Sequence, residues 1–289
     1  MQMAALFSRR TRRVTVALCT VLLFGVLAGV TFQSISNALE RRRFPHPGRL
    51  VEIGNHQLHL HCIGDGAPTV ALEAPAGGLS MTWAWVQDEL ASITRVCSYD
   101  RAGLGWSEAG EGRYDPMRAA DDLHALLQRS RERTPVILAG QEFGAVLARL
   151  YADRFPLDVA GLVLVDDPAE RDGARGSART ARAWPWLARV GVLRITRSLS
   201  RRANGLPDHA RGAAQAFLNR PDHLTRAAQE VARLGDLTAA STAARLDSTV
   251  GVIRVITGRH DPPVVLASRD EAHAVTRALI GAVERARGR

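Results

Sequence analysis

The sequence is poor in cysteine and lacks the short motifs with which proteins hold metal ions. Three cysteines among 289 residues exclude a small domain that depends on disulfides for its stability. Neither an H-E-x-x-H nor a C-x-x-C pattern occurs, and the close group His56, His59 and His61 belongs to one predicted hairpin. We therefore expect no metal site and no cofactor.

Lysine is missing altogether, so all 38 basic side chains are arginines and the formal net charge is +9. Such a charge is typical of nucleic-acid-binding proteins. Here, however, residues 171–202 hold nine arginines and a single acid, with Trp184 and Trp186 among them. No nucleic-acid recognition module is visible, so we expect no nucleic-acid partner. The block is equally consistent with a membrane-surface element and with the solvated face of an ordinary helix.

A run without charged residues near the N-terminus predicts a membrane span over residues 14–33. About 20 apolar residues are enough to cross the hydrocarbon core of a bilayer. A cleaved signal peptide is the alternative, because the small residues 36–38 follow the run. We favour a single-pass anchor with the main domain periplasmic or extracellular, and secretion after cleavage remains the alternative.

After the span, predicted strands and helices alternate. A hairpin over residues 50–62 is followed by βαβ-type alternation, which predicts a mostly parallel sheet covered on both faces. An Ala- and Arg-rich helical block interrupts this pattern before the last strand and predicts a cap. The expected organisation is a basic tail (1–13), the transmembrane helix (14–33), a linker (34–49), an α/β core (50–169 and 249–289) and a helical cap (170–248).

One segment joins a predicted strand directly to a predicted helix through glycines. Gly140 and Gly144 lie two residues before and two residues after Glu142. This spacing predicts a sharp turn that pushes the side chain of Glu142 out at the end of the sheet, which is the geometry of a nucleophile elbow. We expect the histidines of the hairpin to lie away from this end.

Three further motifs follow in an order typical of one family. They are SYDRAGLGWS at residues 98–107, LVLVD at 162–166 and GRHD at 258–261. With the elbow, they resemble the α/β-hydrolase superfamily, and in particular a membrane-anchored bacterial group of esterase- or lipase-like proteins, from about residue 41 to the C-terminus. The resemblance implies the α/β-hydrolase fold and a small-molecule or lipid-like ligand of ester type.

The nucleophile position departs from the family pattern. Members with serine chemistry carry G-x-S-x-G, whereas the central residue here is Glu142 and no such motif occurs anywhere. A serine needs a neighbouring base in order to attack, but a carboxylate does not. Glu142 is therefore the candidate nucleophile, or the base that activates a water. The alternative is a polar residue at an inactive elbow.

The general base departs from the pattern as well. The resemblance places the catalytic acid at Asp261 and a histidine after one further strand, but only 28 residues follow Asp261. We expect that the last edge strand and the family histidine are missing. His260, beside the acid, is the candidate substitute, and His273 is expected on the surface of the final helix.

The resemblance also locates the oxyanion hole. One donor is the backbone N–H of Phe143, directly after the elbow, and the other belongs to the loop after the third strand. Pro75 has no N–H, so Ala76 is the expected donor in that loop.

Cys62 and Cys97 lie on the second and fourth strands, which are neighbours in this fold. They form a disulfide if the domain is exported, and two buried thiols are as consistent with the sequence.

Two functions from different classes follow. The first is a membrane-anchored hydrolase of ester-type or lipid-like substrates that uses Glu142, His260 and Asp261 in a degenerate triad. The second is a catalytically inactive binding or scaffold protein that keeps the pocket of the fold.

Overall fold

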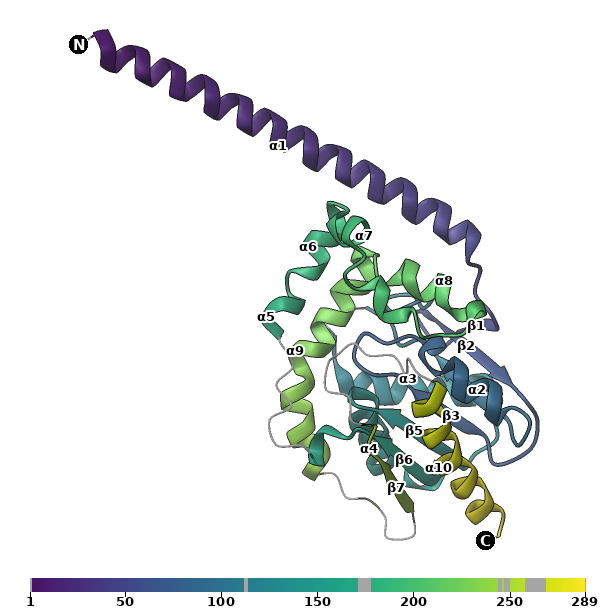
Figure 1. The fold of residues 1–289 in the computed structure, drawn as a ribbon. Coiled ribbons are helices and arrows are strands. Elements are labelled where there is room, and N and C mark those ends of the chain that lie inside the picture. The colour runs from purple at the N-terminus through teal and green to yellow at the C-terminus, as the bar shows by residue number, and fades with distance from the viewer. Residues whose placement is uncertain are drawn as a thin grey trace.

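The computed structural model describes residues 2–111, 114–170, 178–243, 246, 250–257 and 269–288. Its most conspicuous element is α1 (Gln2–Arg43), a single helix that extends far beyond the rest of the chain (Figure 1). The large apolar side chains between Val14 and Phe32 are exposed. Among the described helices, α1 alone is long and apolar enough to cross a membrane.

The prediction of a linker over residues 34–49 is wrong for most of its length, because α1 continues to Arg43. The reason is a packing partner that is distant in sequence. The Arg194 guanidinium forms an ion pair with the Glu40 carboxylate and a hydrogen bond of 3.1 Å with the side chain of Gln33. A polar segment that looks like a linker by composition is thus held as a helix by tertiary contacts.

The core is a seven-stranded sheet in the order β1-β2-β4-β3-β5-β6-β7. The β1–β2 and β2–β4 pairs are antiparallel and the other pairs are parallel, which confirms the mostly parallel sheet with an N-terminal hairpin. Strands β3, β4 and β5 are buried along their whole length, as expected of strands covered on both faces. The strands are β1 (Arg49–Glu52), β2 (Gln57–Ile63), β3 (Val70–Glu73), β4 (Val96–Tyr99), β5 (Val136–Gln141), β6 (Val159–Val165) and β7 (Gly251–Val255).

Two apolar clusters sandwich the sheet. One contains side chains of α3 and α4, and the other contains side chains of α2 and α10, so these pairs cover opposite faces. Helix α3 begins after Asp115, whose carboxylate accepts a hydrogen bond of 3.0 Å from the Met117 N–H. The helices and short 3-10 turns of this layer are η1 (Ser80–Trp83), α2 (Ala84–Leu90), α3 (Pro116–Arg129), α4 (Phe143–Arg154), η2 (Pro156–Asp158), η3 (Pro168–Glu170) and α10 (Arg269–Arg287).

The expected helical cap lies between β6 and β7 in the sequence and covers the sheet on the side that faces α1 (Figure 1). Its described elements are α5 (Ala178–Ala181), α6 (Trp184–Arg189), α7 (Val192–Thr196), η4 (Ser200–Ala203), α8 (Asp208–Phe217) and α9 (Pro221–Ala243). Within the described residues β7 is the edge of the sheet. Residues 258–268 lie outside them, so the loss of a further edge strand stays a prediction.

Candidate functional site

The turn between β5 and α4 has the geometry of a nucleophile elbow. Its single connecting residue, Glu142, has φ 51° and ψ −109°, a backbone region that residues other than glycine rarely occupy. A Cβ atom on Gly140 would overlap the backbone of Gly144, and one on Gly144 would overlap the carbonyl oxygen of Glu73. The two glycines are therefore required by close packing, and they leave the side chain of Glu142 half-buried at the end of the sheet.

Helix α4 starts at Phe143, directly after the turn. The first N–H groups of a helix have no acceptor inside it, so this end of α4 offers donors where the resemblance predicts one. The Phe143 ring is fully buried and lies under the Arg101 guanidinium, 5.3 Å from it. The Phe143 N–H is therefore at the end of the helix where the resemblance predicts an oxyanion donor.

The loop after β3 is pinned by a residue that the sequence did not reveal. The Gly77 N–H donates a hydrogen bond of 2.7 Å to the Glu230 carboxylate, which reaches down from α9 of the cap. The predicted donor Ala76 is fully buried beside it. Nη1 and Nη2 of Arg101 donate to the carbonyl oxygens of Ala74 and Pro75 over 2.7 and 2.8 Å. The loop that should offer a free N–H to a substrate thus already has a carboxylate bound to it.

Arg101 is the centre of a buried ion cluster. Its guanidinium contacts Glu73 over 2.6 Å and both carboxylate oxygens of Glu230 over 2.7 and 2.8 Å. The Tyr99 hydroxyl donates a short hydrogen bond to Glu73. All four side chains are buried.

Burial and charge set the protonation of this cluster. Burial raises the pKa of Glu73 even against the opposing charge of Arg101. Burial, and then the charge of Glu73, raise the pKa of Tyr99 well above its ordinary value, so the phenol remains a donor. Burial by itself would lower the pKa of Arg101. The interactions with Glu230 and Glu73 outweigh burial and raise that pKa well above its ordinary value. The cluster joins β3, the loop after β4 and the cap through one fixed positive charge.

The hairpin histidines lie nearer to this end of the sheet than the sequence predicted. Because β2 runs antiparallel to β4, the start of β2 is beside the carboxyl end of β4, where His59 meets Asp100. The Nδ1–Oδ2 distance is 3.0 Å, and Asp100 also accepts hydrogen bonds from the backbone N–H groups of Ser80 and Trp106. The expectation that the hairpin lies away from the elbow end is wrong for His59.

This His59–Asp100 pair is structural. Burial is the largest influence and disfavours charge on both groups, but the partner's charge and the hydrogen bonds together outweigh it, so the pKa of His59 is raised and the pKa of Asp100 is lowered. Nδ1 of His59 bonds to Asp100 and Nε2 bonds to the carbonyl oxygen of Pro47, so both ring nitrogens donate. Ser80 Oγ lies 3.4 Å from the same Nδ1, which has no lone pair left with which to accept its proton. Ser80 therefore has no base in His59.

The other predicted catalytic residues are not placed near Glu142 by the described part of the chain. Asp261 and His260 both lie in the 258–268 segment outside the described residues. Nδ1 of His273 lies 2.9 Å from the Glu89 carboxylate, and the His273 side chain is 43% exposed, as expected of a residue on the surface of the final helix. At the end of β6, Asp166 accepts a hydrogen bond of 2.9 Å from the Thr257 N–H and so ties the ends of β6 and β7 together.

The sulfur atoms of Cys62 and Cys97 form a disulfide between β2 and β4. Glu132 lies close enough that the three residues could in principle surround a metal ion. Metal ions bind cysteine as the thiolate, and these sulfurs are bonded to each other. The group therefore does not fit a metal ion in this state.

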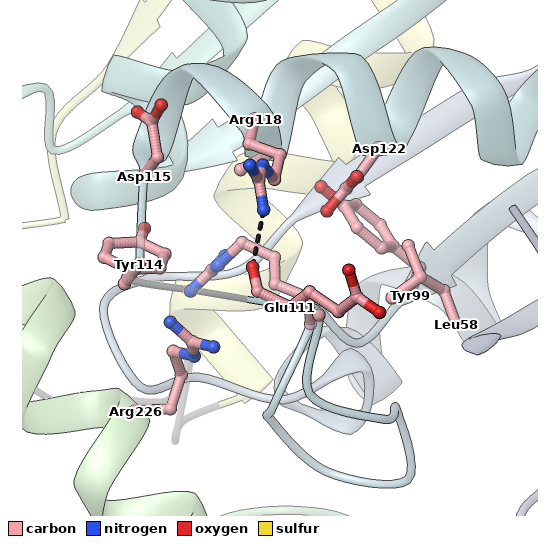
Figure 2. Close-up of a pocket in the computed structure, with 12 residues that line it drawn as sticks. Leu58, Tyr99, Glu111, Tyr114, Asp115, Arg118, Asp122 and Arg226 are labelled. Carbon is pink, nitrogen blue, oxygen red and sulfur yellow. Dashed lines mark hydrogen bonds between the residues drawn. The ribbon is translucent and has the colours of Figure 1, made fainter. Parts of the chain in front are cut away.

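Two of the cavities in the described part of the chain differ in size, and the smaller is lined by Tyr99 and Arg101 of the cluster. The one in Figure 2 lies between α3, the loop before it and Arg226 of α9, and its volume of about 30 Å³ fits a single water. The second has a volume of about 420 Å³, which is in the range of ligand pockets. Its wall is mostly apolar and includes Phe44, Met81, Trp106 and Ala213, and its polar lining residues include His61 and His209.

Comparisons with known proteins agree with this architecture. A family model described as "Alpha/beta hydrolase family" matches residues 58–288. The 2-hydroxy-6-oxo-2,4-heptadienoate hydrolase of Pseudomonas putida is 31% identical over 120 residues, which cover 41% of this chain and 44% of that protein. The chain thus spans less than half the length of the curated relatives that it matches.

Solved structures show the same fold at low identity. An esterase from Thermogutta terrifontis has a TM-score of 0.57 and 19% identity over 80% of this chain and 94% of that one. A haloalkane dehalogenase variant from Bradyrhizobium elkanii has a TM-score of 0.62 and 18% identity over 83% and 97%. At these identities the likeness extends to the fold alone.

Proposed function

Because the chain belongs to the alpha/beta hydrolase family, we propose that it is a membrane-anchored member that binds a small lipid-like molecule and does not carry out serine ester hydrolysis. The observation that carries the proposal is the hydrogen bond of 2.7 Å between the Gly77 N–H and Glu230. It uses a backbone donor of the loop in which an oxyanion hole is expected.

The chemistry of acyl transfer explains why this matters. A serine hydrolase needs a nucleophile with a base beside it and free N–H groups where negative charge develops. Here the elbow carries Glu142, and a carboxylate already occupies the Gly77 N–H. Glu230 is fully buried and paired with Arg101, so it cannot swing away without breaking the ion cluster. The fold is retained while the serine chemistry is not.

The 420 Å³ cavity supports a lipid-like ligand. It lies between the segment that follows α1, the start of α2 and the cap helix α8, and its lining is mostly apolar. Apolar surface removed from water gives about 25 cal/mol per Å², so an alkyl chain gains free energy by entering such a space. The polar groups of the lining, among them His61 and His209, suit the headgroup of an amphiphile.

The proposed location is the membrane, with the core outside the cytoplasm. The length and exposure of the apolar part of α1 support the anchor. The Cys62–Cys97 disulfide supports the outer location, because disulfides persist in oxidising compartments and are rare in the cytosol.

Ester hydrolysis through Glu142 is the second candidate, and the retained elbow favours it. Strained backbone is often stored at functional sites, and Glu142 at φ 51° is such a position. The Glu142 carboxylate would attack the acyl carbon of the substrate, expel the alcohol as an alkoxide that takes up a proton, and form an acyl anhydride with the enzyme, which a base-activated water must then cleave. The proposed base and acid, His260 and Asp261, complete this hypothesis.

A labelling and turnover experiment separates the two functions. The full chain in detergent is treated with a fluorophosphonate probe and with short p-nitrophenyl esters, beside Glu142→Ser, Glu142→Gln and the surface control Glu52→Gln. We expect no labelling and no turnover in any of the four proteins. Turnover in the wild type and in the surface control that is lost in Glu142→Gln would overturn the proposal in favour of Glu142 chemistry.

Photocrosslinking tests the ligand. A fatty acid that carries a diazirine is irradiated with the full chain in vesicles, and the labelled peptides are mapped. We expect label in η1–α2 and α8, lost in Ala213→Trp, which fills the cavity, and retained in Ala240→Trp on the exposed side of α9. Label confined to α1 would refute the cavity as the binding site.

A further inference from the structure

We propose that the cap makes a second contact with the membrane through an apolar tip, defined as the exposed side chains Trp186, Leu187, Val192 and Ile195 of α6 and α7. The proposal rests on the anchor described above and adds a specific lipid-facing surface to it. Trp186 is 70% exposed and Ile195 is 72% exposed. Large apolar side chains that gather on one surface mark an interaction site, whereas single ones need no explanation.

The position of the tip beside α1 indicates that the tip contacts the membrane. Gly29 of α1 lies against the backbone of Val190, which follows α6, so closely that a Cβ atom there would overlap its carbonyl oxygen. A Cβ atom on Gly191 would lie 3.3 Å from the Phe32 ring. Figure 1 shows α6 and α7 as the part of the cap nearest to the middle of α1. Residues 29 and 32 belong to the predicted span 14–33, so the tip lies level with the end of the span, at the membrane surface.

One face of α1 fixes this arrangement. Gly29, Gln33, Asn37 and Glu40 are spaced by three or four residues and therefore share one side of the helix. Gln33 is 2% exposed and donates to the carbonyl oxygen of Asn219 over 2.8 Å. The guanidinium of Arg194 in α7 binds Gln33, Asn37 and Glu40. The cap is thus attached to the anchor by a polar contact, and its height relative to the bilayer is set.

Charge around the tip favours a lipid surface over a protein partner. Residues 178–203 contain seven arginines and no acidic side chain. Arg189 lies over the Trp186 ring at 4.9 Å, which places a cation directly beside the most exposed aromatic side chain. Tryptophan prefers the headgroup level of a bilayer, and basic residues near an anionic lipid surface are attracted to it. The occupant is therefore an anionic lipid surface.

Quenching by brominated lipids tests the contact in the full chain. The protein is reconstituted into vesicles of equimolar phosphatidylcholine and phosphatidylglycerol, with or without bromine on the acyl chains, and tryptophan emission is compared between wild type and Trp186→Phe. We expect the quenched component to fall in the variant, because Trp186 supplies it. The control is the double variant Trp186→Phe/Leu157→Trp, which carries a tryptophan at position 157 instead of position 186. Leu157 is 91% exposed in η2, before β6, and its replacement should remain unquenched.

A second measurement separates failure of the proposed tip contact from failure of the membrane anchor. Resistance to alkaline carbonate extraction reports the insertion of α1 and is measured on the same vesicles. Insertion with equal quenching in wild type and Trp186→Phe would overturn the apolar tip as a lipid contact and leave a protein partner as its occupant. Failure of insertion would instead refute the anchor. Weaker quenching in Arg189→Gln, and in vesicles of phosphatidylcholine alone, is expected if the arginines act on anionic headgroups.

Discussion

The buried carboxylate of Glu230 gives the sharpest test of how the cap is held on the core. It is 0% exposed and accepts hydrogen bonds from Nε and Nη2 of Arg101 and from the Gly77 N–H. Glu230→Ala removes one of two carboxylates from a buried guanidinium and leaves a buried N–H without an acceptor. We therefore expect a large loss of stability from the truncation of this single polar side chain.

The magnitude follows from these contacts. Removal of one partner of a buried ion pair costs about 3–5 kcal/mol, because the remaining charge is left uncompensated. Arg101 keeps Glu73, so the lower half of that range is expected. Glu230→Gln keeps the shape and an acceptor for Gly77 and loses only the charge, so its cost should be closer to about 1–3 kcal/mol, as for one charged hydrogen bond.

Thermal unfolding of the full chain in detergent measures both variants. Domains of this size lose about 2–4 °C in midpoint per kcal/mol, which predicts a decrease of about 6–16 °C for Glu230→Ala and a smaller one for Glu230→Gln. Glu52→Ala, an exposed glutamate in β1, is the matched control and should leave the midpoint unchanged. A shift for Glu230→Ala no larger than that of the control would refute the ion cluster as the link between cap and core.

Three further predictions concern stability. The Cys62–Cys97 disulfide closes a loop of 35 residues, so a double alanine variant should lose about 4 kcal/mol in urea unfolding under oxidising conditions, and reduction should abolish the difference. Burial lowers the pKa of His223 to about 4, so the folded chain keeps it neutral while the unfolded chain takes up a proton below its ordinary value of 6.5. Stability should therefore fall by about 3 kcal/mol as pH decreases from 6.5 to 4, and His223→Gln should lack that part of the decline. At the elbow, Glu142→Gly should be up to about 1 kcal/mol more stable than Glu142→Ala, because glycine adopts φ 51° without strain, and equal midpoints would contradict the strain.

The sequence predicted the sheet because its central strands are buried on both faces and therefore appear as continuous apolar runs. It did not predict the end of α1. The residues from 34 to 43 are polar enough to resemble a linker, and they are helical because Arg194, in the cap, binds them. Such a contact between distant segments has no local signature.

At the site, too, local features were predictable from the sequence and contacts between distant segments were not. The elbow was predictable from two glycines at fixed offsets from Glu142, and the structure has that turn. The Glu230 contact was not predictable, because its helix carries an ordinary amphipathic pattern and only the fold brings it to Gly77. His59 was misplaced because the direction of β2, and not the position of the hairpin in the chain, decides which end of the sheet it reaches.

The elbow glycines explain why the turn is kept although Glu142 stands where the family motif carries serine. A side chain at Gly140 would overlap α4, and one at Gly144 would overlap the end of β3, so neither position tolerates another residue, whatever stands between them. The packing of α4 on the sheet thus preserves the turn, while the residue at 142 is free to change without cost to that packing. The two glycines are therefore evidence for the fold. Evidence for the chemistry comes only from the central residue and from the hydrogen-bond donors around it. Here the central residue is Glu142, and the Gly77 N–H, next to the expected donor Ala76, is already bound to Glu230, which is why we infer a binding function from a hydrolase fold.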